Sequence, residues 1–225
     1  MIIAIDGPAG SGKSSTARAV ARRLGFRHLD SGAFYRALTC AALAAELPVE
    51  RWPELTEQEL DEFGVSARPN EEHGFDLFLD GRKITAELRR PEVNAHVSAM
   101  ARVPTVRSWL LGQLRDAARG TDIVADGRDI GTVVFPEAEL KIFLVADPEV
   151  RARRRLAEYG VTDPTPAELA AEVERLLQRD RSDSEREIAP LVEAEDAVRI
   201  DTSHLRFEEQ VERIVALARS RGARG

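Results

Sequence analysis

The residues from Gly7 to Ser14 have the types and the spacing that bind the phosphates of a nucleotide. They read GPAGSGKS, which matches the phosphate-binding pattern G-x-x-x-x-G-K-[ST]. Glycines allow the backbone to curl so that several N–H groups point at one anion. The ammonium group of Lys13 can reach the outer phosphates, and the hydroxyl of Ser14 can bind Mg²⁺. These residues therefore predict a site for a nucleoside triphosphate.

Two further groups of polar residues follow predicted strands. In the first, DSGAFYR at 30–36, we expect Ser31 to cap a helix, and Arg36 could hold a second phosphate. The alternative is that Arg36 is only a solvated arginine on a helix surface. The second group, ADGRDIGT at 125–132, crowds charged side chains at the end of a buried strand, where loops often carry function. Its alternative is an Asp–Arg pair that only fixes a turn.

A third group consists of arginines around two predicted helices late in the chain. Arginines can stabilise the charge that phosphoryl transfer spreads over phosphate oxygens, and a mobile flap carrying them would exclude water. Interleaved acidic residues leave open the alternative of a solvated charged face. The arginines are Arg151, Arg153, Arg154, Arg155, Arg175, Arg179, Arg181 and Arg186.

The elements that must position these groups alternate between strand and helix, which predicts a parallel sheet. The phosphate loop lies between the first strand and the first helix, at the sheet edge where ligands of such folds bind. Apolar runs predict strands at 1–5, 27–30, 121–125, 140–146 and 198–200. Helical spacing predicts helices at 15–24, 34–46, 148–159, 165–179 and 207–219, with others beginning at Pro91 and near Pro104.

One region breaks this alternation and predicts a small antiparallel insert. The runs at 75–79 and 82–84 are joined by Asp80-Gly81, a typical hairpin turn. The preceding segment, 47–62, is polar and contains prolines. We therefore expect an α/β fold in a single domain, residues 1–225. It comprises a core (about 1–62, 89–147 and 181–225), a β insert (about 63–88) and a helical lid (about 148–180).

Composition excludes some classes of function. A length of 225 residues fits one domain, or one with an insert. A net charge of -7 argues against general nucleic-acid binding, which needs a basic face. No stretch has the apolar length of a membrane span, and no basic-then-apolar leader precedes the loop. Cys40 is the only cysteine and is expected in the core, so a reducing cytoplasm is the expected location.

Four motifs together resemble those of the bacterial cytidylate kinases. They are IDGPAGSGKS at 5–14, DSGAFYR at 30–36, ADGRDIGTVVFP at 125–136, and R-D-x-x-D-S-x-R-x-x-x-P-L at 179–191. The first motif is shared by many NTPases, whereas the second and third at this spacing are specific to the family. Ser182 and Ser184 stand where the family often has further arginine. The resemblance runs nearly end to end.

The resemblance implies a P-loop NTPase-like parallel sheet flanked by helices, with a β insert that binds the nucleoside monophosphate and a helical lid. It implies transfer of the ATP γ-phosphoryl group to CMP or dCMP, giving ADP with CDP or dCDP, by a monomer that uses ATP and Mg²⁺. The implied ATP-binding residues are Gly7, Pro8, Ala9, Gly10, Ser11, Gly12, Lys13, Ser14 and Ser15, with Mg²⁺ at Ser14, partly through water. The implied CMP-binding residues are Ser31, Tyr35, Arg36, Ser98, Arg107, Arg128, Asp129, Arg179, Asp183 and Arg186. The implied catalytic residues are Lys13, Arg128, Arg154, Arg155 and Arg186.

Two other classes remain open from the sequence. One is a kinase of the same core that acts on a different nucleotide or on a shikimate-like alcohol; it would lack the cytosine-reading set Ser98, Arg107 and Asp129. The other is a nucleotide-gated switch, which needs base-specific loops, and no N-K-x-D-like element is present in the sequence.

Overall fold

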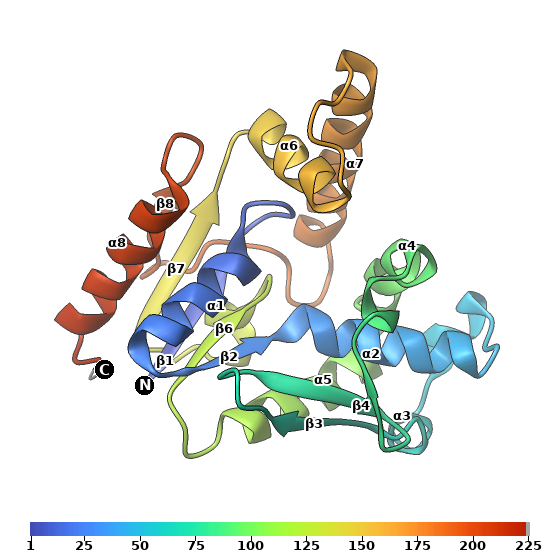
Figure 1. Ribbon diagram of the computed structural model, residues 1–225. Coiled ribbons are helices and arrows are strands. Elements are labelled where there is room, and N and C mark those ends of the chain that lie inside the picture. The colour runs from blue at the N-terminus through green and yellow to red at the C-terminus, as the bar shows by residue number, and fades with distance from the viewer. Residues whose placement is uncertain (224–225) are drawn as a thin grey trace.

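Five parallel strands form the central sheet of this computed structural model, which describes residues 1–223. They lie in the order β2-β6-β1-β7-β8, and each neighbouring pair is parallel. The phosphate loop follows the central strand β1, so it emerges at the carboxyl edge of the sheet (Figure 1). The predicted parallel sheet is confirmed. Its strands are β1 (Ile2–Asp6), β2 (Arg27–Asp30), β6 (Ile123–Asp126), β7 (Leu140–Val145) and β8 (Val198–Asp201).

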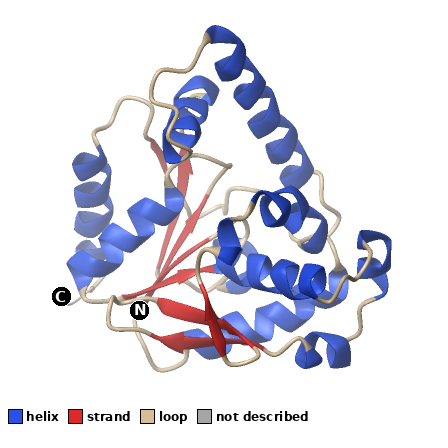
Figure 2. Cartoon of the chain, turned by 45° about the vertical axis from the view of Figure 1, so that its right-hand side comes forward, coloured by secondary structure: helices blue, strands red, loops and turns tan. Residues whose placement is uncertain are grey.

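Helices cover both faces of this sheet because successive side chains of a strand point to opposite faces. Ile3 and Ile5 of β1 pack with side chains of α1 and α8, whereas Ala4 between them packs with side chains of α2 and α5. Figure 2 shows the strands of the main sheet with helices on either side. The helices are α1 (Lys13–Leu24), α2 (Ser31–Ala44), α5 (Pro104–Ala118) and α8 (Phe207–Ser220).

The predicted antiparallel insert is confirmed. Strands β3 (Val65–Pro69), β4 (Phe75–Leu79) and β5 (Arg82–Ile84) form a separate sheet in that order. The turn between β4 and β5 holds Asp80 at φ 48° and Gly81 at φ 75°, the left-handed pair that a tight hairpin requires. Leu77 and Ile84 are buried in the same core as α2 and α5, so this sheet is packed onto the body of the protein.

The insert is also hydrogen-bonded to β2 of the main sheet. The turn between β3 and β4 places its backbone beside the outer edge of that strand. The main-chain N–H of His28 donates to the carbonyl of His73 at 2.6 Å, and Nη1 of Arg27 donates to the carbonyl of Asn70 at 3.1 Å. Two bonds therefore join one end of the insert to the core.

The helices α6 (Pro148–Glu158) and α7 (Pro166–Ser184) stand beyond the end of β7, in the region predicted to be a lid (Figure 1), and are called the lid helices below. They have a small apolar core of their own. Ala9 of the phosphate loop packs in this core, which links the lid to the loop. The other members are Ala152, Leu156, Leu169 and Leu176.

Helix α7 runs past its predicted end at Arg179. It ends at Ser184, so Arg179 and Asp183 lie four residues apart on the same helix face. Thr165 begins the helix with a capping box, in which its hydroxyl accepts from the N–H of Glu168 while the Glu168 carboxylate accepts from the N–H of Thr165.

Several local predictions need correction. Asp30, not Ser31, is the N-cap of α2, because its carboxylate accepts from the N–H of Ala33 at 3.0 Å and Ser31 is already helical. Cys40 is half-buried rather than a core residue, with its thiol toward the carbonyl of Glu87.

The polar segment at 47–62 contains ordered structure with a buried Trp52. It holds a 3₁₀ helix, η1 (Val49–Glu54), and a short α-helix, α3 (Glu57–Glu62), which starts with a Thr56–Glu59 capping box. The remaining elements are η2 (Glu87–Arg89), α4 (Pro91–Met100) and the π-helical turn η3 (Ile130–Val134). Within residues 1–223, no helix is long and apolar enough to cross a membrane.

Candidate active site

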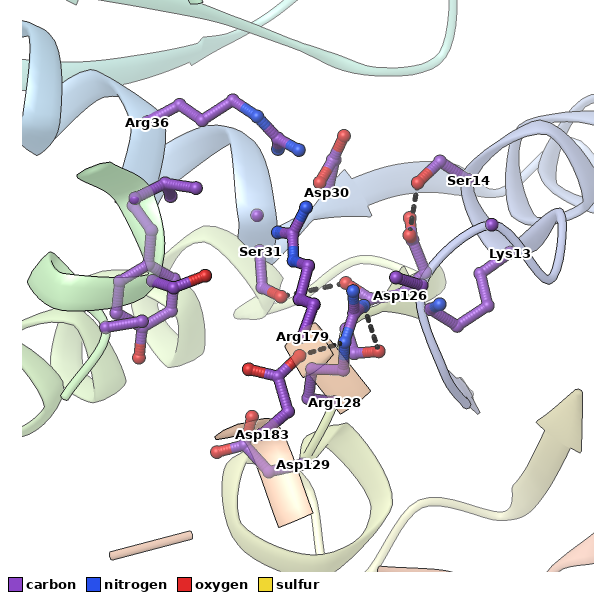
Figure 3. Close-up of a pocket in the computed structure, with 18 of the residues that line it drawn as sticks. Lys13, Ser14, Asp30, Ser31, Arg36, Asp126, Arg128, Asp129, Arg179 and Asp183 are labelled. Carbon is purple, nitrogen blue, oxygen red and sulfur yellow. Dashed lines mark hydrogen bonds and ion pairs between the residues drawn. The ribbon is translucent and has the colours of Figure 1, made fainter. Parts of the chain in front are cut away.

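A cavity of about 170 Å³ lies at the carboxyl edge of the sheet, between the phosphate loop, α2, α4 and the lid. Its walls bring together segments that are far apart in the chain, as Figure 3 shows. Among the residues predicted from the sequence, the cavity is lined by Ala9, Gly10, Gly12, Lys13, Ser14, Ser15, Ser31, Tyr35, Arg36, Ser98, Arg107, Arg128, Asp129, Arg155, Arg179, Asp183 and Arg186. Of the implied ATP-binding, CMP-binding and catalytic residues, four are outside that lining: Gly7, Pro8, Ser11 and Arg154. The remaining arginines of the third group, Arg151, Arg153, Arg175 and Arg181, do not line it either.

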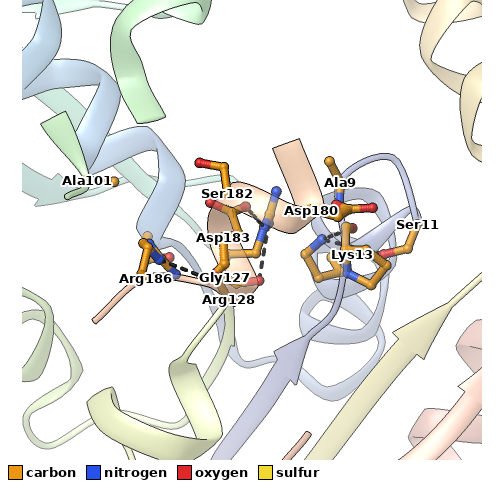
Figure 4. Close-up of polar contacts among 12 residues, drawn as sticks. Ala9, Ser11, Lys13, Ala101, Gly127, Arg128, Asp180, Ser182, Asp183 and Arg186 are labelled. Atoms are coloured by element: carbon orange, nitrogen blue, oxygen red, sulfur yellow. Dashed lines mark hydrogen bonds and ion pairs between the residues drawn. The ribbon is translucent and has the colours of Figure 1, made fainter. Parts of the chain in front are cut away.

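Lys13 is buried at the start of α1 and points back into the phosphate loop. Its Nζ donates to the carbonyl of Pro8 at 2.7 Å and to the hydroxyl of Ser11 at 3.4 Å (Figure 4). Burial and the positive charge of Arg128 lower the pKa of Lys13 well below its usual value. In the described part of the chain no carboxylate contacts this ammonium, so it is available to an anion in the loop.

Ser14 is held at the cavity wall by Asp126, the last residue of β6. The Ser14 hydroxyl donates to Oδ2 of Asp126 at 2.6 Å. Hydroxyl and carboxylate oxygens are hard donors of the kind Mg²⁺ prefers, so these residues fit a magnesium ion. In residues 1–223 there is no cluster of three or more His, Cys, Asp or Glu side chains suited to a metal. Such a site fits an ion held largely by substrate phosphates and water.

The guanidinium groups of Arg36, Arg128, Arg155 and Arg179 gather around the cavity. Burial, together with the positive charges of Arg128, Arg36 and Arg155, lowers the pKa of Arg179 to about 10, although Asp183 opposes this shift. Burial also lowers the pKa of Arg36, despite the nearby Asp30. Such an excess of positive charge favours a ligand with several negative oxygens.

Among residues 1–223, two arginine N–H groups at this cavity are buried without an acceptor. They are Nε of Arg179 and Nη2 of Arg186. A buried donor without a partner costs roughly 1–3 kcal/mol, a cost that a bound anion would remove. Figure 3 shows the side chains of Arg36 and Arg179 reaching toward the same space.

Asp183 of α7 supplies one negative charge among these arginines. Nε of Arg128 donates to its Oδ2 at 2.8 Å, and Nε of Arg186 donates to its main-chain carbonyl at 3.2 Å (Figure 4). Burial alone would raise the pKa of Asp183, but Arg128, Arg179 and Arg186 hold it below its usual value. The carboxylate therefore stays ionised and fixes Arg128 at the cavity wall.

The far side of the cavity contains a buried ion pair between Arg107 of α5 and Asp129. Nη1 of Arg107 also donates to the carbonyl of Ala101 at 3.0 Å, and the guanidinium lies 5.7 Å from the ring centre of Tyr35. Ser98 of α4 lines the same part of the cavity. Fixed donors and acceptors in a dry wall can distinguish one nucleotide base from another.

Comparison with known proteins identifies the family. The family model described as cytidylate kinase matches residues 3–220. A cytidylate kinase from Streptococcus pneumoniae (strain 70585) is 45% identical over 219 residues, covering 97% of each chain. A second cytidylate kinase, from S. pneumoniae (strain Hungary19A-6), gives the same identity and coverage. The chain belongs to the cytidylate kinase family.

A solved structure also shares the fold of this member of the cytidylate kinase family. It is an uncharacterized protein from Eubacterium ventriosum ATCC 27560, with a TM-score of 0.53 at 11% sequence identity. The alignment covers 98% of this chain and 99% of that one. At this identity the similarity concerns the fold alone.

Adjacent arginines of the lid take different positions in this cytidylate kinase family member. Arg155 lines the cavity, where Nη1 bonds Glu158 at 2.9 Å and the guanidinium stacks 5.0 Å from the ring centre of Tyr159. Arg154 instead donates to the hydroxyl and carbonyl of Thr202, at 3.0 and 2.7 Å, and to the carbonyl of Ser11 in the phosphate loop at 3.5 Å. Adjacent helix positions face different directions, so the two arginines contact different parts of the protein.

Some residues of the site were not predicted from the sequence, among them Asp6, His28 and Asp180. Asp6, at the end of β1, accepts from the N–H groups of Ile130 and Gly131 at 2.8 and 2.7 Å and fixes the loop after Asp129. His28 contacts Asp126, and Asp180 accepts from the N–H of Ala9 at 2.9 Å. Asp6 could have been found from the sequence, because it ends a predicted parallel strand and ligands of such sheets bind at the carboxyl ends of the strands.

Asp6 should make stability depend on pH in an unusual direction. Burial raises the pKa of Asp6 to about 6 from an ordinary value of 3.8. The folded chain then retains a proton that the unfolded chain releases between those pH values, so this contribution to stability falls as pH rises through the window. We compare the free energies of unfolding of the wild type and of Asp6→Asn. The wild-type value minus the variant value should fall by up to about 3 kcal/mol from pH 4 to pH 7.

Urea unfolding of both proteins at closely spaced pH values measures this difference. Taking the difference cancels the carboxylates whose charge does not interact with Asp6. If the difference in the free energy of unfolding stayed constant or rose with pH, the pKa of Asp6 would not be raised as stated.

Proposed function

We propose that the protein transfers the γ-phosphoryl group of ATP to CMP or dCMP, giving ADP with CDP or dCDP. The observation that carries this proposal is the position of four arginines, Arg36, Arg128, Arg155 and Arg179, in the cavity. They lie between the phosphate loop and the polar wall formed by Ser98, Arg107 and Asp129. That order of groups matches two phosphate-bearing ligands whose phosphates meet in the middle. Membership of the cytidylate kinase family supports the choice of acceptor.

On the donor side, the phosphate loop from Gly7 to Ser15 would surround the ATP phosphates. Its backbone N–H groups, the ammonium of Lys13 and the start of α1 all favour negative charge. Ser14 would hold Mg²⁺, partly through water, with Asp126 orienting its hydroxyl. When bound, the ion would neutralise charge on the β- and γ-phosphate oxygens.

On the acceptor side, Ser31, Arg36, Arg128 and Arg186 would hold the monophosphate, and Tyr35 would support Arg107. Ser98, Arg107 and Asp129 would read the cytosine, since a carboxylate accepts from its amine and an arginine donates to its ring acceptors. Arg179 and Asp183 would contact the sugar. The unpartnered donors of Arg179 and Arg186 support this arrangement.

Catalysis in such a site would be alignment with charge neutralisation, without a covalent intermediate. Lys13, Arg128, Arg155 and Arg186 would stabilise charge on the transferring group. Closure of α6 and α7 would exclude water, which would otherwise accept the phosphoryl group. The apolar contact of Ala9 with the lid core would couple that closure to the phosphate loop.

A coupled assay of ADP release with a panel of acceptors tests the proposal. We expect turnover with CMP and dCMP, much less with UMP, and little with AMP, GMP or shikimate. Reactions without acceptor measure ATP hydrolysis, and reactions with EDTA measure the need for Mg²⁺. Equal turnover across the nucleotides, or hydrolysis unaffected by acceptor, would contradict the proposal.

The lid arginines give a prediction about separate kinetic constants. Since Arg155 lines the cavity, Arg155→Ala should lower kcat by about 10²-fold with little change in the KM for CMP, because the charge it meets develops in the transition state. Arg154→Ala, its matched neighbour, should mainly raise the KM for ATP, because Arg154 contacts Thr202 beside the phosphate loop. Steady-state kinetics in both substrates measures this, and a raised CMP KM with unchanged kcat in Arg155→Ala would place Arg155 in the acceptor site instead.

A further inference from the structure

His28 lies beneath the proposed magnesium site, on the edge strand β2. Its strand pairs with β6 so that the side chains of His28 and Asp126 meet. Nε2 of His28 is 2.7 Å from Oδ1 of Asp126, and both side chains are buried. The other oxygen of the same carboxylate, Oδ2, accepts from Ser14. One buried carboxylate is thus held at both oxygens, by a histidine on one side and by the proposed metal ligand on the other.

From this geometry we infer that His28 is a positioning residue for the magnesium site, acting on Ser14 through Asp126. The inference rests on the proposed function for the identity of the metal-bound nucleotide. His28 does not touch the nucleotide in this role. It fixes the direction of a carboxylate, and the carboxylate fixes the direction of a hydroxyl.

The direction of each hydrogen bond follows from what the groups can do. The oxygens of a carboxylate only accept hydrogen bonds, and Asp126 is contacted at Oδ1 by His28 and at Oδ2 by the Ser14 hydroxyl. Nε2 of His28 must therefore carry a hydrogen and donate it. Ser14 must likewise donate its single hydrogen to Asp126, which turns the lone pairs of its Oγ away from the carboxylate. Those lone pairs are what a magnesium ion requires.

Loss of the His28 donor would leave Oδ1 of Asp126 buried without its partner. The carboxylate could then rotate, and Ser14 would no longer be held in one direction. Groups that orient metal ligands in this way typically change metal affinity by 10- to 100-fold when removed. The effect should therefore appear in the magnesium-dependent part of nucleotide binding.

A purely structural role for His28 makes a different prediction. The main-chain N–H of His28 bonds the carbonyl of His73 in the insert, and a side-chain substitution leaves that bond available. If the imidazole only filled space, its loss would weaken nucleotide binding equally with and without Mg²⁺, or not at all. The two roles are therefore separable by one ratio, the dissociation constant of ADP in EDTA divided by that in Mg²⁺.

Calorimetric titration of the full chain with ADP, in Mg²⁺ and in EDTA, measures this ratio. We expect His28→Leu to lower the ratio by about tenfold. His28→Gln should keep the ratio within about twofold of wild type, because its amide brings an N–H donor to a similar position. His96→Leu is the matched control, since His96 bonds the carbonyl of Glu92 on α4, and its ratio should equal that of wild type. The magnesium concentration for half-maximal kinase rate should rise in His28→Leu alone.

An unchanged ratio in His28→Leu overturns the inference, as does an equal loss of affinity in Mg²⁺ and EDTA. Should His28→Leu fail to fold, His28→Met fills a similar volume without a donor, and His28→Gln still tests whether a donor is sufficient. A low ratio in His28→Gln would also contradict the inference that His28 acts by donating to Asp126. Because ADP binding needs no acceptor, failure of the acceptor assay would leave this measurement intact and the two conclusions distinguishable.

Discussion

Replacing Lys13 by alanine is expected to lower kcat by about 10³-fold while the protein stays folded. The buried ammonium of Lys13 contacts the carbonyl of Pro8 and the hydroxyl of Ser11 and lies where the outer phosphates of ATP would be. Its lowered pKa means that burial in the loop disfavours the charged form. Removing the charge should therefore not lower the midpoint of thermal unfolding, and it should remove the group that meets the transferring phosphoryl.

Single-turnover kinetics and thermal unfolding together test this expectation. Lys83→Ala is the matched control, because Lys83 forms a surface pair with Asp76 in the insert and its loss should leave kcat unchanged. Turnover of Lys13→Ala within about tenfold of wild type would contradict a role of the loop in phosphoryl transfer.

The choice of base should depend on Asp129. A carboxylate accepts from the amine of cytosine but faces a carbonyl acceptor in uracil, and an unpaired buried polar group costs roughly 1–3 kcal/mol, more when charged. We expect wild type to prefer CMP over UMP by at least about a hundredfold in kcat/KM. Asp129→Asn should cut the rate with CMP sharply and narrow or reverse this preference, since its amide can donate to uracil.

Asparagine is the informative substitution because of the buried partner of Asp129. Arg107 is paired with this carboxylate, and alanine would leave the arginine charge without a partner, at a cost of about 3–5 kcal/mol. An amide oxygen still accepts from Arg107. Asp116→Asn is the matched control, because Asp116 lies on the exposed side of α5 and pairs with Arg119.

Steady-state kinetics of these variants with CMP and UMP decides the assignment. Arg107→Met should weaken both pyrimidines, since its donors meet ring acceptors that the two bases share. If Asp129→Asn kept the wild-type ratio of CMP to UMP, the base would be read elsewhere in the cavity.

Features encoded by neighbouring residues were predictable from the sequence. The phosphate loop, the strands around it and the Asp80-Gly81 hairpin each have a local pattern, and the structure contains all of them. The short helix α3 had a local signal too, the Thr56–Glu59 capping box, but two prolines and a polar composition obscured it. At α2, two adjacent residues could both cap the helix, and spacing alone does not choose between Asp30 and Ser31.

Contacts between distant residues could not be read in the same way. Nothing near His28 in the sequence indicates that its ring meets Asp126, because the pairing depends on which strands are neighbours and in what register. The same holds for Arg107 and Asp129, which come from α5 and from the loop after β6. The separate positions of Arg154 and Arg155 depend on how α6 rotates against the core. Sequence patterns named the residues on these elements, but the sheet and its packing decide which of them touch.

The bond between the insert and β2 has a consequence for how the protein behaves in a crowded solution. Strand β2 is at one edge of the main sheet, and a bare strand edge can recruit a strand from another molecule and so begin aggregation. The outward N–H of His28 already donates to the carbonyl of His73. Next to it, the side chain of Arg27 donates to the carbonyl of Asn70. The insert therefore also serves as a cover for that edge, and shortening its first turn would expose a site for intermolecular strand pairing.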